Sequence, residues 1–168
     1  MALVLSSADV QRCLTMTDAI GVMRSAFAAL YHGQAEMPQR LSVSLSEEGV
    51  ALIMPSLLQT IDQSAFSLKV ITVMPHNPSH KLPLSHATVL LLDSTTGRTL
   101  AVLDGTWLTA MRTGAVSGLA TAMLALRSAN ILALFGAGAQ APTQALAIHS
   151  VRPLEEIRVV NRNEEHYR

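Results

Sequence analysis

The stretch ILALFGAGAQ, residues 131 to 140, joins an apolar run to a glycine-rich turn. Gly136, Gly138 and Ala141 form the pattern GxGxxA, and the helix-compatible residues 143 to 149 follow. In such a strand–turn–helix unit the first glycine permits the tight turn and the second lets the backbone approach a pyrophosphate, which sits on the helix N-terminus. We therefore predict that a dinucleotide-binding domain begins here, although the chain stops at Arg168.

A second strand is expected at residues 157 to 160, and Asn161 and Arg162 follow it. Many dinucleotide-binding folds place an acidic residue near this position to bind the ribose 2′-hydroxyl, and neither residue is acidic. Asn161 can still hydrogen-bond a ribose, while Arg158 and Arg162 add charge that suits a 2′-phosphate. This favours NADP(H). The alternative is that the arginines are solvated charges at a strand end, and their position alone does not separate the two interpretations.

The composition is typical of a soluble, cytoplasmic, globular protein, with 49% hydrophobic and 14% charged residues. A formal net charge of zero argues against a nucleic acid or an acidic membrane surface as partner. The single cysteine, Cys13, cannot form an internal disulfide, and its helical surroundings predict a packed thiol. No signal peptide or membrane-spanning apolar stretch is expected.

Residues 1 to 125 are predicted to form a separate domain of mixed α and β structure in front of the nucleotide domain at 126 to 168. Thr17 is the expected cap of a helix that ends at Gly33. Strands are expected at residues 41–45, 50–54, 65–73, 87–92 and 100–103, the last two forming a hairpin. A helix at 108–126 carries Gly114 and Gly118, four positions apart, where another backbone could pack closely.

Three cations stand in otherwise apolar or small-residue surroundings. Lys69 lies in the expected strand 65–73, Arg112 near the start of the helix 108–126, and Arg40 before the strand 41–45. A single such lysine usually extends its amine towards solvent, whereas three cations together could bind a carboxylate. Histidines at 76, 80 and 86 match no tight zinc pattern, so no metal site is expected.

The chain resembles the ornithine cyclodeaminase and mu-crystallin family throughout residues 1 to 168. The resemblance is carried by MPQR at 37–40, Lys69, MPHNP at 74–78, HATVLLLD at 86–93, TGRTLAVLDG at 96–105, TAMRTGAVS at 109–117 and GAGAQA at 136–141. It implies an α/β enzyme with an N-terminal domain of mixed α+β structure for substrate binding and dimerisation, followed by a Rossmann domain that binds NAD or NADP.

The same resemblance implies roles for individual residues. Arg40, Lys69 and Arg112 match the family's cations around the substrate carboxylate, and Lys69 would also take part in catalytic proton transfer. Gly136, Gly138, Ala139 and Gln140 match the pyrophosphate-binding turn, and Thr113 would lie on the nicotinamide side. With Asn161 and Arg162 from the strand end, these residues complete the predicted cofactor site.

The implied activity is reduction of a cyclic imino acid by NAD(P)H, with the substrate a small amino or imino acid and the protein a homodimer. Ornithine cyclodeaminase activity, in which the cofactor is recycled, is one alternative, and a non-catalytic, ligand-binding protein of the mu-crystallin type is another. A chain without a stable fold also stays open. Leu84 replaces a small hydroxyl residue found in some members, Pro142 replaces a common arginine, and the region of the family's catalytic aspartate is missing. We therefore expect these 168 residues alone to be inactive.

Overall fold

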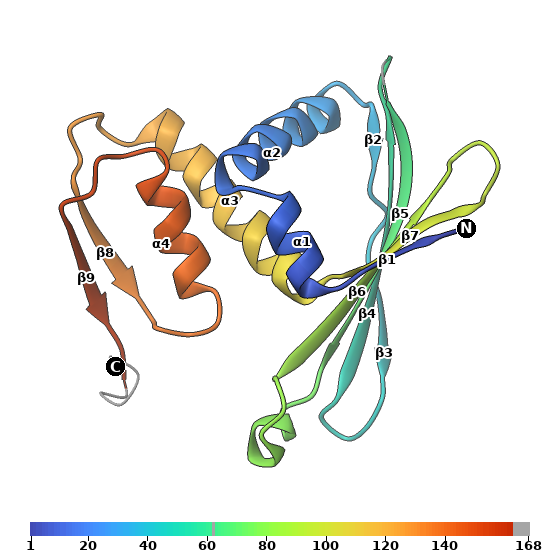
Figure 1. Cartoon of the computed structure of the whole chain (residues 1–168). Coiled ribbons are helices and arrows are strands. Elements are labelled where there is room, and N and C mark those ends of the chain that lie inside the picture. The colour runs from blue at the N-terminus through green and yellow to red at the C-terminus, as the bar shows by residue number, and fades with distance from the viewer. Residues whose placement is uncertain (62, 163–168) are drawn as a thin grey trace. The chain divides into compact units, whose positions relative to one another are not determined.

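The computed structural model describes residues 1–61 and 63–162. The chain divides into two compact units, one formed by Met1–Cys13 with Ala26–Thr109 and the other by Leu14–Ser25 with Ala110–Arg168. Figure 1 shows the elements of both units along the chain. The boundary expected near residue 125 is one between functional domains, and it stays a prediction.

The first unit is built on a seven-stranded sheet in the order β1-β7-β6-β5-β4-β2, with β3 also paired to β4. All pairs are antiparallel except that of β1 with β7. The strands are β1 (Leu3–Leu5), β2 (Ala35–Glu36), β3 (Leu41–Ser44), β4 (Val50–Gln59), β5 (Ser64–Val73), β6 (Ser85–Leu92) and β7 (Thr99–Asp104). The five expected strands and the hairpin of β6 with β7 are confirmed.

Strand β4 continues beyond the expected end at Met54. One edge of β4 pairs with β5. The opposite edge pairs with β3 as far as Ile53 and with β2 from Leu57 onwards, so Pro55 lies in the gap between β3 and β2. Proline lacks an N–H and is tolerated in a strand where no ladder hydrogen bond is required. The expected strand at 50–54 is therefore part of a longer strand that ends at Gln59.

Four α-helices and one 3-10 helix lie in the described residues 1–61 and 63–162. They are α1 (Ser7–Cys13), α2 (Met16–Tyr31), η1 (Asn77–His80), α3 (Thr106–Leu124) and α4 (Ala141–His149). No single described helix is long and apolar enough to cross a membrane, and α1 with α2 meets that length only as a pair bent by 85°.

The N-terminus of α2 is capped by Thr15 and not, as expected, by Thr17. The Asp18 backbone N–H donates to Thr15 Oγ1 over 3.2 Å, and the Thr15 hydroxyl in turn donates to the Asp18 carboxylate. At the other end Gly33 has a φ of +69°, and its N–H and that of Gln34 donate to carbonyls of the last helical turn. Gly33 is thus confirmed as the helix stop, because glycine adopts this left-handed conformation without a Cβ clash.

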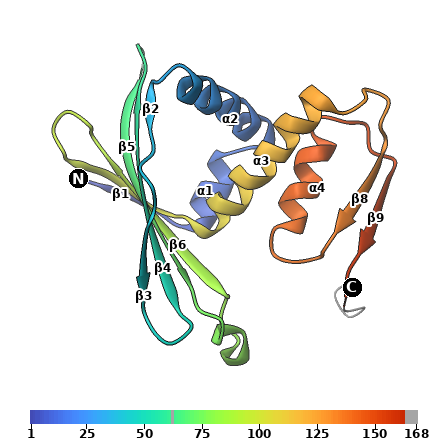
Figure 2. The same cartoon turned by 180° about the vertical axis from the view of Figure 1, so that it is seen from behind.

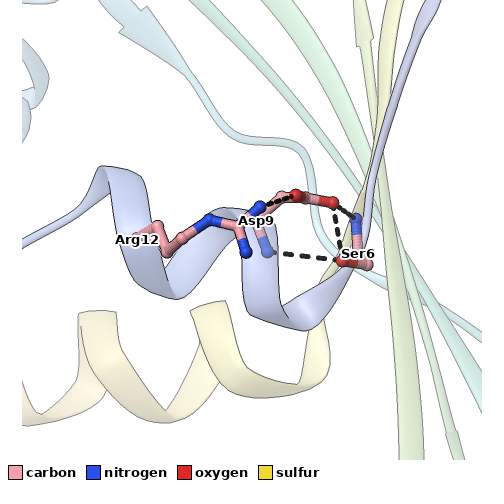
Figure 3. A network of polar contacts seen from close by, with 3 residues as sticks. All are labelled: Ser6, Asp9 and Arg12. Carbon is pink, nitrogen blue, oxygen red and sulfur yellow. Dashed lines mark hydrogen bonds and ion pairs between the residues drawn. The ribbon is translucent and has the colours of Figure 1, made fainter.

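Helix α1 begins with a similar cap, seen in Figure 3. Asp9 accepts hydrogen bonds from the backbone N–H and hydroxyl of Ser6, at 2.9 and 2.6 Å, and forms an ion pair with Arg12. The Ser6 oxygen accepts from the Asp9 N–H in return. Cys13, the last residue of α1, is exposed, so the prediction of a packed thiol was wrong.

In the second unit α4 lies between α3 and a two-stranded parallel sheet, as both views show (Figures 1 and 2). The strands are β8 (Ile131–Phe135) and β9 (Glu156–Val160). A Cβ atom on Gly114 would lie 2.5 Å from the Thr143 carbonyl oxygen, and one on Gly118 would lie 3.0 Å from that of Ala147. The expected close backbone packing at these glycines is confirmed, and its partner is α4.

Candidate functional site

The glycine-rich turn joins the end of β8 to the start of α4. Gly136 has a φ of +96°, a conformation that L-residues with a Cβ rarely adopt, and its N–H donates to the Val160 carbonyl over 2.7 Å. Gly138 lies in ordinary backbone, and the Ala141 N–H donates to its carbonyl. Nothing lies within 4 Å of a Cβ built on either glycine, so the space beside the turn is open.

The first turn of α4 has no side-chain cap. Gln140, the residue before the helix, makes no capping hydrogen bond, and Pro142 occupies a position where its missing N–H is tolerated. The Thr143 hydroxyl donates to the Gln140 carbonyl over 2.9 Å. A helix N-terminus without its own acidic cap favours an anion. The residues present therefore fit the pyrophosphate of a dinucleotide.

The end of β9 meets the start of this turn through the hydrogen bond from Gly136 to Val160, so the next residue, Asn161, lies beside the turn. Asn161 is half-buried and Arg162 is exposed. Arg158 contributes no uncompensated charge, because its guanidinium donates to both Glu156 carboxylate oxygens at 2.8 and 3.0 Å. That hydrogen-bonded pair lowers the pKa of Glu156 and raises that of Arg158. Of the two arginines, Arg162 alone remains as a candidate for a 2′-phosphate.

Lys69 and Arg40 belong to the first unit. Lys69 is half-buried in β5 between Met54 of β4 and Val89 of β6. Arg40 is exposed and directly precedes β3, whose first residue, Leu41, pairs with Ile53 of β4.

Arg112 and Thr113 lie on α3 in the second unit, Arg112 exposed and Thr113 half-buried. The predicted clamp of three cations needs residues from both units and stays a prediction. Leu84 is half exposed, in the connection between β5 and β6.

The start of α3 is held on the sheet by contacts that sequence reasoning missed. The Gly105 N–H donates to the Ala87 carbonyl over 2.8 Å, and a Cβ on Gly105 would lie 3.0 Å from the Ala87 backbone. The Ala87 N–H donates to Thr106 Oγ1, and the Trp107 N–H donates to Asp104 Oδ1. The signal was present in the motif LDGT, an acid and a glycine directly before a helix, which is typical of an N-terminal cap.

Of the three histidines at 76, 80 and 86, His76 has a charged neighbour. His76 lies 3.2 Å from a carboxylate oxygen of Glu48, an exposed contact between the β3–β4 turn and the β5–β6 connection. No group of three or more potential metal ligands occurs in residues 1–61 and 63–162.

Comparison with known proteins gives one consistent result. The sequence profile of the ornithine cyclodeaminase/mu-crystallin family matches residues 1–168. The chain is 37% identical over 164 residues to Delta(1)-pyrroline-2-carboxylate reductase of Bacillus cereus, which covers 97% of this chain and 50% of that relative.

Two solved structures share the fold. The Thermococcus litoralis Delta(1)-pyrroline-2-carboxylate reductase in complex with NADH and L-proline has a TM-score of 0.92 at 39% identity, covering 98% of this chain and 50% of that one. An archaeal alanine dehydrogenase dimer with bound NAD has a TM-score of 0.91 at 30% identity with the same coverage. The predicted fold class is confirmed, and the chain spans about half the length of the relatives it matches.

Proposed function

This chain belongs to the ornithine cyclodeaminase/mu-crystallin family, and from that membership we propose that it is the N-terminal portion of an NAD(P)H-dependent reductase of cyclic imino acids, of the ketimine or pyrroline-2-carboxylate type. The observation that carries the proposal is the open glycine turn between β8 and α4, with the end of β9 hydrogen-bonded to it. The relatives named as pyrroline-2-carboxylate reductases support the substrate class.

The residues divide into two sets by task. Gly136, Gly138, Ala139 and Gln140 would hold the pyrophosphate, and Asn161 and Arg162 the adenosine ribose and its substituent. Thr113 would lie at the nicotinamide. A bound NAD(P)H supplies hydride for reduction of the imine carbon.

The substrate carboxylate would be bound by Arg40, Lys69 and Arg112. Arginine suits this task because its planar fork donates two parallel hydrogen bonds to a carboxylate. Lys69 stands half-buried in β5, and its ammonium would add positive charge and hold the proton that the imine nitrogen needs. Fixing the carboxylate in this way orients the reacting carbon.

Two measurements test the proposal. The purified 168 residues are titrated with NADH, NADPH and ADP-ribose, and we expect binding without turnover of Delta(1)-pyrroline-2-carboxylate. The longest open reading frame that contains these residues is then assayed for reduction of the same imine by loss of nicotinamide absorbance. If the 168 residues bind none of these ligands and the longer protein does not use the cofactor, the proposed cofactor site is wrong. Turnover by the 168 residues would overturn the expected inactivity.

The same assays separate the alternatives. Ornithine cyclodeaminase activity would release ammonia from ornithine with no net change in cofactor absorbance. A ligand-binding protein of the mu-crystallin type would bind without turnover even at full length. Arg162 favours NADPH over NADH, and equal turnover with NADH would contradict that preference. We further propose a homodimer, supported by the alanine dehydrogenase dimer, to be checked by light scattering.

A further inference from the structure

Arg152 lies in the connection between α4 and β9, and it is the one buried charged residue in residues 1–61 and 63–162. Its relative exposure is 9%. A buried guanidinium is unfavourable unless its donors are satisfied and its charge is compensated. No carboxylate forms an ion pair with Arg152 in the part of the chain that the structure describes.

The compensation comes from the C-terminus of α3. Arg152 Nη2 donates to the carbonyls of Thr121 and Ala125, both at 2.7 Å, and Nε donates to that of Leu126 at 3.0 Å. Thr121 lies in the last turn of α3 and Ala125 and Leu126 directly follow the helix, at the negative end of its dipole. The Thr121 and Leu126 carbonyls also accept from the Ala125 and Ala129 N–H groups, so Arg152 adds second hydrogen bonds to both. Helix α3 has no basic residue in its own last turn. Arg152 therefore caps α3 from a distant part of the chain.

The same residue is firmly joined to α4. The Arg152 N–H donates to the Ile148 carbonyl over 2.9 Å, and the Ser150 N–H donates to that of Leu146. Arg152 Nη1 also donates to the adjacent Val151 carbonyl. One short segment thus ties the C-terminal end of α4 to the C-terminal end of α3.

The remaining contact between the two helices has a different character. Gly114 and Gly118 allow the α3 backbone to approach Thr143 and Ala147 closely, and the Cβ atoms of those two residues lie 3.2 Å from the Cβ positions of the glycines. Interlocking side chains normally fix one helix against sliding along another, and glycine supplies only a gap and no large side chain of its own. The glycine contact sets the separation of α3 and α4, and the hydrogen bonds of Arg152 hold their C-terminal ends at one axial position.

We propose that Arg152 is a positioning residue that sets the axial register of α4 on α3, and through it the placement of the phosphate-binding turn relative to Arg112 and Thr113. All these groups belong to the second unit: the turn begins α4, and Arg112 and Thr113 lie on α3. The link to binding rests on the proposed function, because it takes the turn to be a cofactor site. The register itself does not depend on that function.

The register is measured directly by pulsed spin-label distances between the exposed positions Ala120 on α3 and Leu146 on α4, each changed to Cys in a Cys13→Ser background. Arg152→Met keeps an unbranched apolar side chain, shorter than that of arginine, and removes every donor. We expect it to broaden or shift the distance distribution, and Arg152→Lys to restore it in part. Arg127→Met removes an exposed arginine from the loop after α3 and is the matched control, expected to leave the distribution unchanged.

The consequence for binding is read from the Gly136 and Gly138 amide resonances during titration with ADP-ribose. We expect Arg152→Met to weaken binding about tenfold or more at a temperature where circular dichroism shows the variant folded. Arg127→Met should bind as the unsubstituted protein does. Added methylguanidine should restore part of the affinity of Arg152→Met. An unchanged label distance in folded Arg152→Met would overturn the register proposal. If the unsubstituted protein does not bind ADP-ribose, the proposed cofactor site fails, while the distances still decide the role of Arg152.

Discussion

At the scale of the residue, Gly136 and Gly138 serve the same turn for different physical reasons. Gly136 needs the absence of a Cβ for its own backbone, whose φ is +96°, whereas Gly138 has ordinary backbone and open space around it. The two glycines should therefore respond differently to alanine. Backbone strain would appear at the first position and obstruction of a bound phosphate at the second.

We predict that Gly136→Ala destabilises the protein by about 1–3 kcal/mol, because alanine is strained at positive φ, and also weakens dinucleotide binding. Gly138→Ala should leave the free energy of unfolding unchanged or raise it by up to about 1 kcal/mol while weakening binding at least about tenfold, equivalent to about 1.4 kcal/mol. Chemical denaturation and ADP-ribose titration of both variants provide the measurement. A Gly138→Ala protein that binds as the unsubstituted one does would place the phosphates elsewhere.

Some residues could be assigned a role from the local sequence, and others could not. The glycine turn was predicted because its function is local, and every part of it lies within about ten residues. The cap of α2 was assigned to Thr17, although the spacing of Thr15 to Asp18 is that of a capping box, whose second member stands three residues on. Arg152 was missed because its partners lie 26 to 31 positions earlier, and no local pattern encodes such a contact.

At the scale of the element, the pairing of α3 with α4 depends on backbone approach. A Cβ on Gly114 would lie 2.5 Å from the Thr143 carbonyl oxygen, and a backbone atom cannot move aside as a flexible side chain can. We predict that Gly114→Ala lowers the free energy of unfolding by about 1–3 kcal/mol through overpacking. Urea denaturation followed by circular dichroism measures this change.

The matched control is Gly21→Ala in α2. Gly21 is exposed within its helix, and nothing lies within 4 Å of its Cβ position. Alanine there should raise the free energy of unfolding by about 0.5–1 kcal/mol, because it reduces the entropy of the unfolded chain and favours the helix. Destabilisation by both substitutions would mean that the cause is not the contact with α4.

The cap of α1 predicts a dependence of stability on pH. Hydrogen bonds from the side chain and backbone of Ser6, and then the charge of Arg12, lower the pKa of Asp9 below its ordinary 3.8 (Figure 3). A lowered folded-state pKa means that the stabilisation is complete above 3.8 and is lost as the pH falls through the lower, folded-state value.

Asp9→Asn removes the titrating group without removing the helix. We predict that it is less stable than the unsubstituted protein at neutral pH and that the difference shrinks as the pH falls below 3.8. Thermal unfolding between pH 7 and pH 2.5 measures the two curves. Parallel curves across this range would show that the Asp9 charge contributes nothing to folding.

The position of a strand can be predicted from its own sequence, whereas its end depends on the neighbouring strands. Alternation and β-branched residues located β3 to β7, because these patterns are local. The end of β4 depended on which strands flank it, since Pro55 is tolerated only in the gap between β3 and β2. The short strands β1 and β2 were not predicted, because with 3 and 2 residues they are too short for any periodicity to show.

At the scale of the whole molecule, the described residues of the second unit, up to Arg162, cover one side of its sheet. Helix α4 packs against β8, where Leu132 and Leu134 are half-buried. The opposite side carries Phe135, 79% exposed, and the paired Val160, 54% exposed. Exposed apolar side chains on a two-stranded sheet with a free edge favour association with other chains. The chain as described should therefore self-associate through this side.

We predict that Phe135→Lys reduces hydrophobic-dye binding and concentration-dependent association, measured by sedimentation velocity, while changing the free energy of unfolding by no more than about 0.5 kcal/mol, as is usual for exposed positions. Leu134→Lys is the control on the covered side, and burial of its charge should destabilise the unit by at least about 2 kcal/mol. The two substitutions differ by one position and by the face of the strand, so they separate association from folding. Unchanged association in Phe135→Lys would mean that the chains associate through another surface, because the substitution places a charge at the most exposed apolar position of the β8–β9 pair.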